Sequence, residues 1–295
     1  MRSELRLDLP AGYRTQDVLA FHSRDAEGLA EQVSEAGLRK GVLIDGVPVV
    51  LDVEFETNVA RCTVDADRGL TEALLEQARE ALLNILGLRI DPTAFAAFVH
   101  DDPVLGSVVT RQPGLRVVQS ATIFEALTWA IIGQQINLPF AISLRRTFIG
   151  LAGRPHTSGL WCYPEAQDVA RLTLDDLTSR KFSRAKAETL LRFAGLVADG
   201  KIALDRDRPV DEVVEELLAI KGIGPWTVNY ALLRGYGYPD CSLQGDVAIR
   251  TAFHRLIGGN ERPGIAATEK LLERYAPHRT MAAAYLWLSL GDSPA

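Results

Sequence analysis

The chain has 295 residues, of which 47% are hydrophobic and 24% are charged, a composition typical of globular proteins with sizeable cores. No apolar run is long enough to cross a bilayer, and the first six residues lack the apolar stretch of a signal peptide. We therefore expect a cytoplasmic protein of two or three domains that has no membrane partner.

The charge is distributed unevenly. The formal net charge is −6, but the acidic surplus lies in the first 100 residues and the remainder is almost balanced. A basic cluster in this second part surrounds Glu188 and consists of Arg180, Lys181, Arg184, Lys186 and Arg192. Local patches decide whether a surface attracts nucleic acid. Such a cluster is, however, usually a solvated face, so it identifies no partner by itself.

Cysteine and histidine usage argues against a metal site. Cys62, Cys162 and Cys241 lie far apart, and neither their spacing nor that of the five histidines resembles a zinc or iron–sulfur pattern. We expect free thiols in a reducing compartment and no bound metal.

The first 92 residues predict an α+β domain with a small antiparallel sheet. Residues 3–9 alternate polar and apolar side chains, as a half-buried strand does. Asp45-Gly46 is a two-residue hairpin signal between strands at 41–44 and 47–55, and Pro48 predicts that the second of these begins at a sheet edge. The other elements expected here are a helix at 26–36, a strand at 59–64 and a helix at 70–86.

Beyond residue 92 the patterns predict helices, so the chain as a whole is mainly α. Pro139 begins one helix and Gly150 ends it, because proline suits the first helical position and glycine the end. Asp211 is the expected N-cap of a helix at 212–220, and Gly235 the expected stop of another. The remaining helices are predicted at 124–132, 225–234, 247–257 and 281–290.

Residues 217–227 form the most informative segment. A helix ends, Gly222-Ile223-Gly224 reverses the chain, and Pro225 begins the next helix. The glycines can adopt backbone angles closed to other residues, and the turn exposes N–H groups at a helix N-terminus, where a phosphate can bind without sequence being read. An ordinary tight connection between two helices is the alternative.

A second feature follows 24 residues after Gly222. Gly245-Asp246 precedes the predicted helix at 247–257, so Asp246 is placed as an N-cap. A helix N-terminus also favours the charged carboxylate that catalysis would need. Capping and catalysis are therefore compatible interpretations.

Taken together, the hairpin, Pro225 and the Gly-Asp pair resemble the helix-hairpin-helix DNA glycosylase superfamily. Within it, residues 124–136, 182–188 and 220–230 resemble the DNA-3-methyladenine glycosylase II family of bacteria. The resemblance implies a two-part helical core, with one part formed by residues 93–122 and 239–295 and the other by residues 123–238. It also implies a monomer that acts on double-stranded DNA containing alkylated bases.

The resemblance further assigns roles to individual residues. Asp246 would be the catalytic carboxylate, and a base flipped out of the duplex would enter a pocket while Gln135 fills the vacated space. The implied pocket residues are Trp226, Tyr230, Phe21, Val247 and His278. The implied DNA contacts are Gln134, Gln135, Ile136, Lys221, Gly222, Ile223, Gly224, Thr227 and Arg250.

Trp226 and Tyr230 share one helix face because they are four residues apart. This face could stack on a cationic alkylated base, although two core aromatics would show the same spacing. Val247 and His278 stand where relatives have aromatic residues, which predicts an open pocket and a wider range of lesions.

Position 226 separates two subclasses. Bifunctional relatives carry a lysine here that forms a Schiff base, whereas this chain has Trp226. The sequence therefore predicts a hydrolase without lyase activity. No cofactor is implied, apart from a monovalent cation that the hairpin could hold when DNA is bound.

Three functions remain open at this point. The chain could release alkylated bases, it could be a glycosylase of the same fold for deaminated or oxidised purines, or it could be a non-catalytic DNA-binding module. The last would need neither Asp246 nor the face formed by Trp226 and Tyr230.

Overall fold

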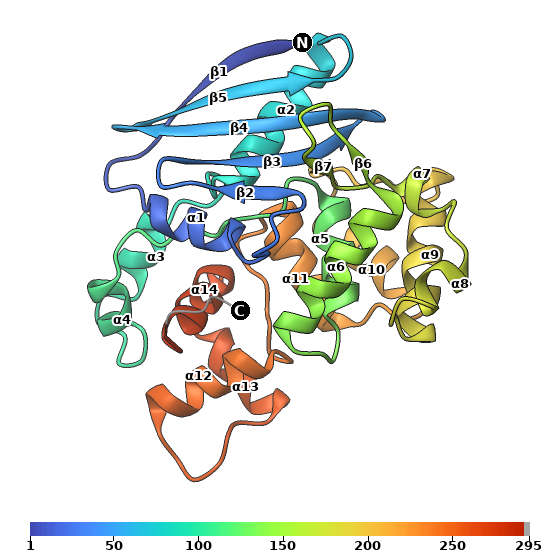
Figure 1. Cartoon of the computed structure of the whole chain (residues 1–295). Coiled ribbons are helices and arrows are strands. Elements are labelled where there is room, and N and C mark those ends of the chain that lie inside the picture. The colour runs from blue at the N-terminus through green and yellow to red at the C-terminus, as the bar shows by residue number, and fades with distance from the viewer. Residues whose placement is uncertain (292–295) are drawn as a thin grey trace.

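The computed structural model describes residues 1–291. It confirms a mainly α fold with a small antiparallel sheet at the N-terminus. In Figure 1 the sheet lies across the top of the molecule, α2 lies behind it, and most of the other helices lie below it. The elements are β1 (Arg2–Asp8), α1 (Thr15–His22), β2 (Glu31–Val33), β3 (Gly37–Ile44), β4 (Val47–Glu56), β5 (Val59–Ala66), α2 (Glu72–Ile85), α3 (Thr93–Phe98), α4 (Gly106–Arg111), α5 (Ile123–Gly133), α6 (Leu138–Ala152), β6 (Arg154–Pro155), β7 (Trp161–Cys162), α7 (Ala166–Val169), α8 (Leu174–Thr178), α9 (Arg184–Ala198), α10 (Val210–Leu218), α11 (Pro225–Ala231), η1 (Leu232–Tyr236), α12 (Val247–Ile257), α13 (Ile265–Glu273) and α14 (Arg279–Leu288).

The sheet has the strand order β1-β5-β4-β3-β2, and all neighbouring strands are antiparallel. Asp45 and Gly46 form the β3–β4 turn with positive φ values of 50° and 71°, as the hairpin signal predicted. The edge placement of β4 is wrong, because β4 lies between β5 and β3. Pro48 is tolerated because it lies beside the turn, at the start of the strand.

The helix expected at residues 26–36 is also wrong. Gly28 adopts a positive φ of 60° there, and the chain then forms the edge strand β2. The short helix of this region lies earlier, at α1. The buried carboxylate of Glu31 explains the strand, because pairing with β3 brings it against the Lys40 ammonium. A tertiary ion pair has overridden the local helix propensity of this segment.

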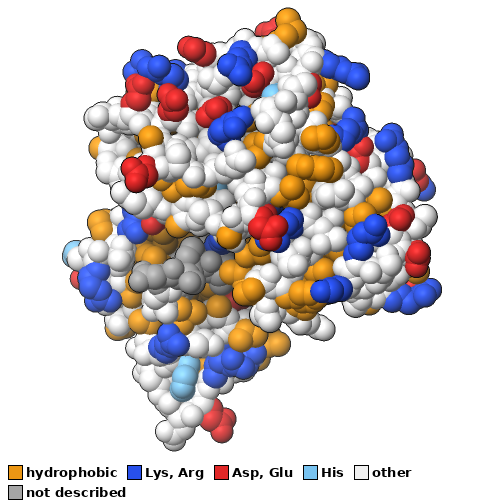
Figure 2. Space-filling model, viewed as in Figure 1, with side chains coloured by type: hydrophobic (Ala, Val, Ile, Leu, Met, Phe, Trp, Pro, Cys, Tyr) orange, Lys and Arg blue, Asp and Glu red, His pale blue; other side chains and the backbone are white. Residues whose placement is uncertain are grey.

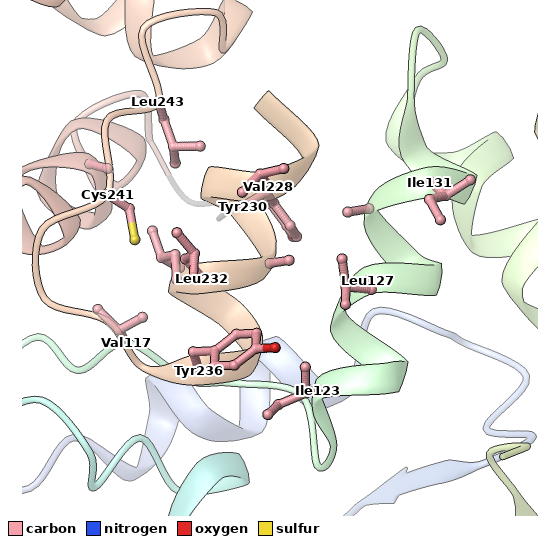
Figure 3. Packing of buried hydrophobic residues seen from close by; sticks show 14 of the residues in the cluster. Val117, Ile123, Leu127, Ile131, Val228, Tyr230, Leu232, Tyr236, Cys241 and Leu243 are labelled. Atoms are coloured by element: carbon pink, nitrogen blue, oxygen red, sulfur yellow. The ribbon is translucent and has the colours of Figure 1, made fainter. Parts of the chain in front are cut away.

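Two hydrophobic clusters stabilise the molecule. One lies between the sheet and α2, and the other extends through the helical body and includes residues from both of the predicted helical parts. Figure 3 shows the contact between α5, which contributes Leu127 and Ile131, and α11, which contributes Val228 and Tyr230. The division of the helices into two domains stays a prediction.

A buried ion network joins the sheet to the helices. The Lys40 ammonium of β3 lies 2.8 Å from a Glu125 carboxylate oxygen of α5, and the Arg145 guanidinium of α6 lies 2.7 Å from the same oxygen. Burial alone would raise the pKa of Glu125, but these two cations hold that pKa below its usual value. The carboxylate is therefore charged at neutral pH and fixes the sheet against α5 and α6.

Several helix ends differ from the sequence-based expectation. The helix begun at Pro139 continues past Gly150 to Ala152, and Asp211 lies in the first turn of α10 without capping it. Gly235 does not stop α11, because the chain continues as the π-helix η1 and Gly237 ends it with a φ of 68°. The helix at residues 247–257 has the predicted bounds.

Candidate active site

A cleft of about 870 Å³ opens where four segments meet. These are the α5–α6 loop, the turn before α11 together with α11 itself, the start of α12, and α14. Figure 2 shows hydrophobic side chains gathered in the middle of the molecular face below the sheet. The cleft has the size and the largely apolar character of a small-molecule site.

Asp246 lies at the cleft wall and caps α12. One carboxylate oxygen accepts hydrogen bonds from the backbone N–H groups of Ala248 at 2.9 Å and Ile249 at 3.0 Å. The indole N–H of Trp226 donates to the other oxygen at 3.0 Å, and that of Trp287 donates to the first at 3.3 Å. These partners are all neutral N–H donors, so the carboxylate is held in one orientation while its charge remains available to the cleft.

Aromatic rings form the wall next to this carboxylate. The Trp226 and Tyr230 rings stack with centroids 5.2 Å apart and planes at 30°, and the Trp287 ring lies 6.3 Å from Tyr230. The Trp129 indole N–H donates to the Tyr230 hydroxyl at 3.0 Å. Tyr230 is only 6% exposed, whereas Trp226 is partly exposed and presents ring surface to the cleft.

The turn between α10 and α11 is the expected hairpin. Gly222 has a φ of 100°, and a Cβ atom there would lie 2.0 Å from the Thr189 hydroxyl oxygen. Gly224 is the N-cap of α11 with a φ of −112° and has open space around it. The side chain of Ile223 is buried in the core. The turn therefore needs glycine at 222, while at 224 the small residue leaves room for an approaching phosphate.

The α5–α6 loop lies against this hairpin. The Gln134 amide donates to the Gly222 carbonyl at 3.0 Å and to the Thr227 hydroxyl at 2.8 Å. Gln135 follows with an exposed side chain and a positive φ of 55°. The side chain of Ile136 is half-buried. Gln135 is thus an exposed residue of this loop that also lines the cleft.

Other predicted residues have different surroundings. Asp246, Trp226, Tyr230 and the 58%-exposed Val247 line the cleft, as do six predicted DNA contacts, Gln134, Gln135, Ile136, Gly222, Gly224 and Thr227. Of the lining described within residues 1–291, none comes from Phe21, His278, Lys221, Ile223 or Arg250.

Phe21 and His278 lie outside this lining, and their pocket roles stay predictions. The Phe21 ring lies beneath the Arg24 and Arg234 guanidinium groups, at 4.2 and 4.9 Å. The His278 ring contacts Phe95 and Phe98 edge-on, with centroids 6.2 and 5.4 Å away. Both are fixed by partners outside the cleft.

Among the predicted DNA contacts, Lys221 is exposed and its carbonyl accepts a hydrogen bond from Arg192 at 2.9 Å. The Arg250 guanidinium donates to the Pro263 carbonyl at 2.8 Å, which ties α12 to the loop before α13. The Thr227 side chain is buried and serves Gln134 rather than solvent.

Sequence reasoning missed Trp287 and Trp129. Both lie within helices that were predicted, at residues 281–290 and 124–132, but their apolar surroundings indicated only core packing. The signal that was available is the indole N–H, which needs an acceptor when a tryptophan is buried. In the structure these acceptors are Asp246 and the Tyr230 hydroxyl.

The chemistry available to the cleft follows from these residues. Of the described residues that line it, none is a lysine, and Trp226 follows Pro225 in the first turn of α11. Within residues 1–291 no group of three or more potential metal ligands occurs, and the three cysteines are buried free thiols. No helix in that range is long and apolar enough to span a membrane.

Two carbonyl oxygens of the hairpin have hydrogen-bond partners within the protein. The Lys221 and Gly222 carbonyls already accept hydrogen bonds from Arg192 and Gln134. Each oxygen keeps a second lone pair, and the monovalent cation at the hairpin stays a sequence-based prediction.

Comparisons with known proteins give a consistent result. A DNA-3-methyladenine glycosylase of Bacillus subtilis (strain 168) is 33% identical over 205 residues, which are 67% of this chain and 67% of that protein. DNA-3-methyladenine glycosylase 2 of Escherichia coli (strain K12) is 25% identical over 268 residues, covering 85% of this chain and 91% of that one. The solved structure of a 3-methyladenine DNA-glycosylase from Archaeoglobus fulgidus has the same fold, with a TM-score of 0.80, 23% identity and coverage of 96% and 97%.

The family comparison includes the site itself. Residues 128–278, just over half of the chain, match the family described as HhH-GPD superfamily base excision DNA repair protein. This range contains the hairpin, the stacked pair Trp226 and Tyr230, and Asp246. The chain therefore belongs to the HhH-GPD superfamily of base excision DNA repair proteins.

Proposed function

We propose that this protein is a monofunctional DNA glycosylase, which hydrolyses the bond between deoxyribose and alkylated bases such as 3-methyladenine and 7-methylguanine. One observation carries the proposal. The Asp246 carboxylate lies at the wall of an aromatic cleft and accepts hydrogen bonds from two backbone N–H groups and two indole N–H groups. None of these four donors carries a positive charge.

The substrate class follows from the aromatic wall. A base methylated at a ring nitrogen is cationic, and a cation over an aromatic ring gains on the order of 0.5–2 kcal/mol. Trp226 offers its partly exposed ring to such a base, while Tyr230 stacks on that ring and Trp287 lies against Tyr230. The relatives named as 3-methyladenine glycosylases support the same class.

The reaction needs few groups from the protein. When the glycosidic bond breaks, its electron pair goes to the cationic base, which leaves as a neutral molecule. The sugar gains positive charge, and the Asp246 carboxylate stabilises it by its own negative charge. Water then adds to the sugar carbon, and its proton passes to the Asp246 carboxylate or to solvent. Indole hydrogen bonds keep the carboxylate oriented throughout.

The absence of lysine from the described lining of the cleft supports hydrolysis without strand cleavage. A Schiff base would need an amine at the position of Trp226. Borohydride should therefore trap no covalent complex with lesion-containing DNA. A trapped adduct of the active enzyme would contradict the monofunctional assignment.

We also propose how the protein meets its substrate. The hairpin N–H groups and Gln135 approach double-stranded DNA from one side of the cleft, and the protein acts as a monomer in the cytoplasm. Because phosphate contacts dominate, binding should be salt-sensitive and largely independent of sequence.

The experiment that tests the proposed function is incubation with duplex DNA treated with dimethyl sulfate, followed by chromatography of the released bases. Free 3-methyladenine and 7-methylguanine should accumulate with time, with guanine and adenine remaining at the level of the enzyme-free control. Release of oxidised or deaminated purines from matched substrates, with no methylated base released, would instead assign a different lesion class.

A further inference from the structure

Helix α9 carries three residues of the basic cluster, Arg184, Lys186 and Arg192, whose contacts differ. Arg184 is 75% exposed and pairs with Glu188 one turn further on, at 2.8 Å. Lys186 is half-buried, and its ammonium donates to the Ile132 carbonyl at 2.7 Å and to the Gln134 carbonyl. Arg184 is thus a solvated surface residue, whereas the Lys186 side chain is directed into the protein.

The two carbonyls held by Lys186 lie where α5 ends and the α5–α6 loop begins. The last carbonyls of a helix have no partners within the helix, and a cation there also interacts favourably with the helix dipole. Lys186 therefore satisfies both needs at the base of the loop. Burial lowers the pKa of Lys186.

The same helix also holds the hairpin. Thr189, one turn beyond Lys186, lies against Gly222, and Arg192 donates to the Lys221 carbonyl at 2.9 Å. The Gln134 amide then joins the loop to the hairpin through the Gly222 carbonyl. Helix α9, the loop and the hairpin thus form a closed set of contacts.

This set fixes the position of Gln135. The residue before it is anchored through both its carbonyl and its side chain, and the residue Asn137 after the loop caps α6 by accepting the Phe140 N–H at 3.0 Å. Between these anchors Gln135 adopts a positive φ that is unfavourable for a residue with a side chain. The anchors maintain this conformation and keep the side chain exposed.

We propose that Lys186 is a positioning residue, which holds the α5–α6 loop at a fixed distance from the hairpin so that Gln135 can fill the space left by a flipped base. This inference deepens the proposed function and rests on it for the identity of the DNA substrate. Lys186 acts through the loop and touches neither the base nor the sugar.

The test measures binding rather than base release. It compares the affinity for a duplex containing a tetrahydrofuran abasic-site analogue with the affinity for the intact duplex, because only the former offers a gap to fill. The parent should prefer the abasic duplex. Lys186→Met should lose about 10-fold of this preference, as expected for the loss of a charge-assisted hydrogen bond, while Lys186→Arg should stay within about 3-fold of the parent.

Arg184→Met is the matched control, since it removes one positive charge from the same helix without touching the loop. It should weaken binding to both duplexes alike and leave the preference unchanged. Gln134→Ala removes the other anchor of the loop, so it should lose the same preference as Lys186→Met, and the double variant should lose little more than either single one.

The inference would be overturned if Lys186→Met and Arg184→Met preferred the abasic duplex over the intact duplex to the same extent. It would also be overturned if the parent showed no preference for the abasic duplex. The outcome is separable from the proposed function. A protein that shows the expected binding pattern but releases no methylated base would contradict the proposed activity and leave the role of Lys186 intact.

Discussion

Replacing Asp246 by asparagine removes one negative charge from the cleft and changes little else. The oxygen that accepts the Ala248 and Ile249 N–H groups can be retained by the amide, so α12 keeps its cap. The second oxygen, which accepts the Trp226 indole N–H at 3.0 Å, becomes an NH₂ group. Two donors then face each other, and that one hydrogen bond is lost.

The two consequences differ in size. Losing one hydrogen bond at a half-buried site costs about 1–3 kcal/mol of the free energy of unfolding, which leaves the protein folded. Losing a preorganised charge at a developing cation lowers the rate by about 100- to 1000-fold, judging from the removal of single electrostatic contacts in other enzymes. Asp246→Asn should therefore be folded, should bind DNA, and should release base at least about 100-fold more slowly.

The assay is single-turnover release of 7-methylguanine with enzyme in excess, accompanied by urea unfolding and by binding to intact duplex. Asp211→Asn is a suitable control, because it neutralises an exposed aspartate in the first turn of α10. A folded Asp246→Asn variant that retains more than about a tenth of the parent rate would refute the role assigned to this carboxylate.

Three further predictions concern the hairpin, the cleft and the ion network. Gly222→Ala should destabilise the hairpin and weaken binding to all DNA, whereas Gly224→Ala should leave the unfolding midpoint unchanged and weaken binding alone, as titrations with labelled duplex can show. Val247→Tyr should narrow the cleft and reduce release of any 1-methyladenine or 3-methylcytosine more than that of 3-methyladenine. His278→Trp is the control, because His278 lies outside the lining of the cleft. If both variants released the same set of bases, the proposed pocket would be contradicted. Because the folded pKa of Glu125 is depressed, its stabilising contribution is complete above the unfolded pKa of about 4.3 and is lost as the pH falls through the lower folded value. Urea unfolding at a series of pH values should show that loss. As the pH falls below about 4.3, the free energy of unfolding of the parent should decrease more steeply than that of Glu125→Gln.

Local chemistry made part of the structure predictable from sequence. Glycine and proline determine the hairpin and the start of α11. Asp246 caps α12 because aspartate is strongly preferred at the N-cap position of a helix. The same logic located the β3–β4 turn at Asp45 and Gly46. Each of these features depends on residues that are neighbours in the chain.

Features that depend on distant contacts were not predictable in this way. Residues 26–36 form no helix because Glu31 meets Lys40 and Arg145 across the fold. Trp287 reaches Asp246 only because α14 crosses beside the start of α12. The presence of Trp287 in the lining of the cleft is thus a tertiary result, which a single sequence does not specify.

The most direct test of the account uses one duplex that contains a single 7-methylguanine and a labelled strand. Base release is followed by chromatography, and strand integrity is followed by electrophoresis before and after heating in alkali. The account predicts that free 7-methylguanine appears while the strand stays intact until alkali is added. A strand nicked by the enzyme alone, or a 7-methylguanine that remains attached at saturating enzyme, would contradict it.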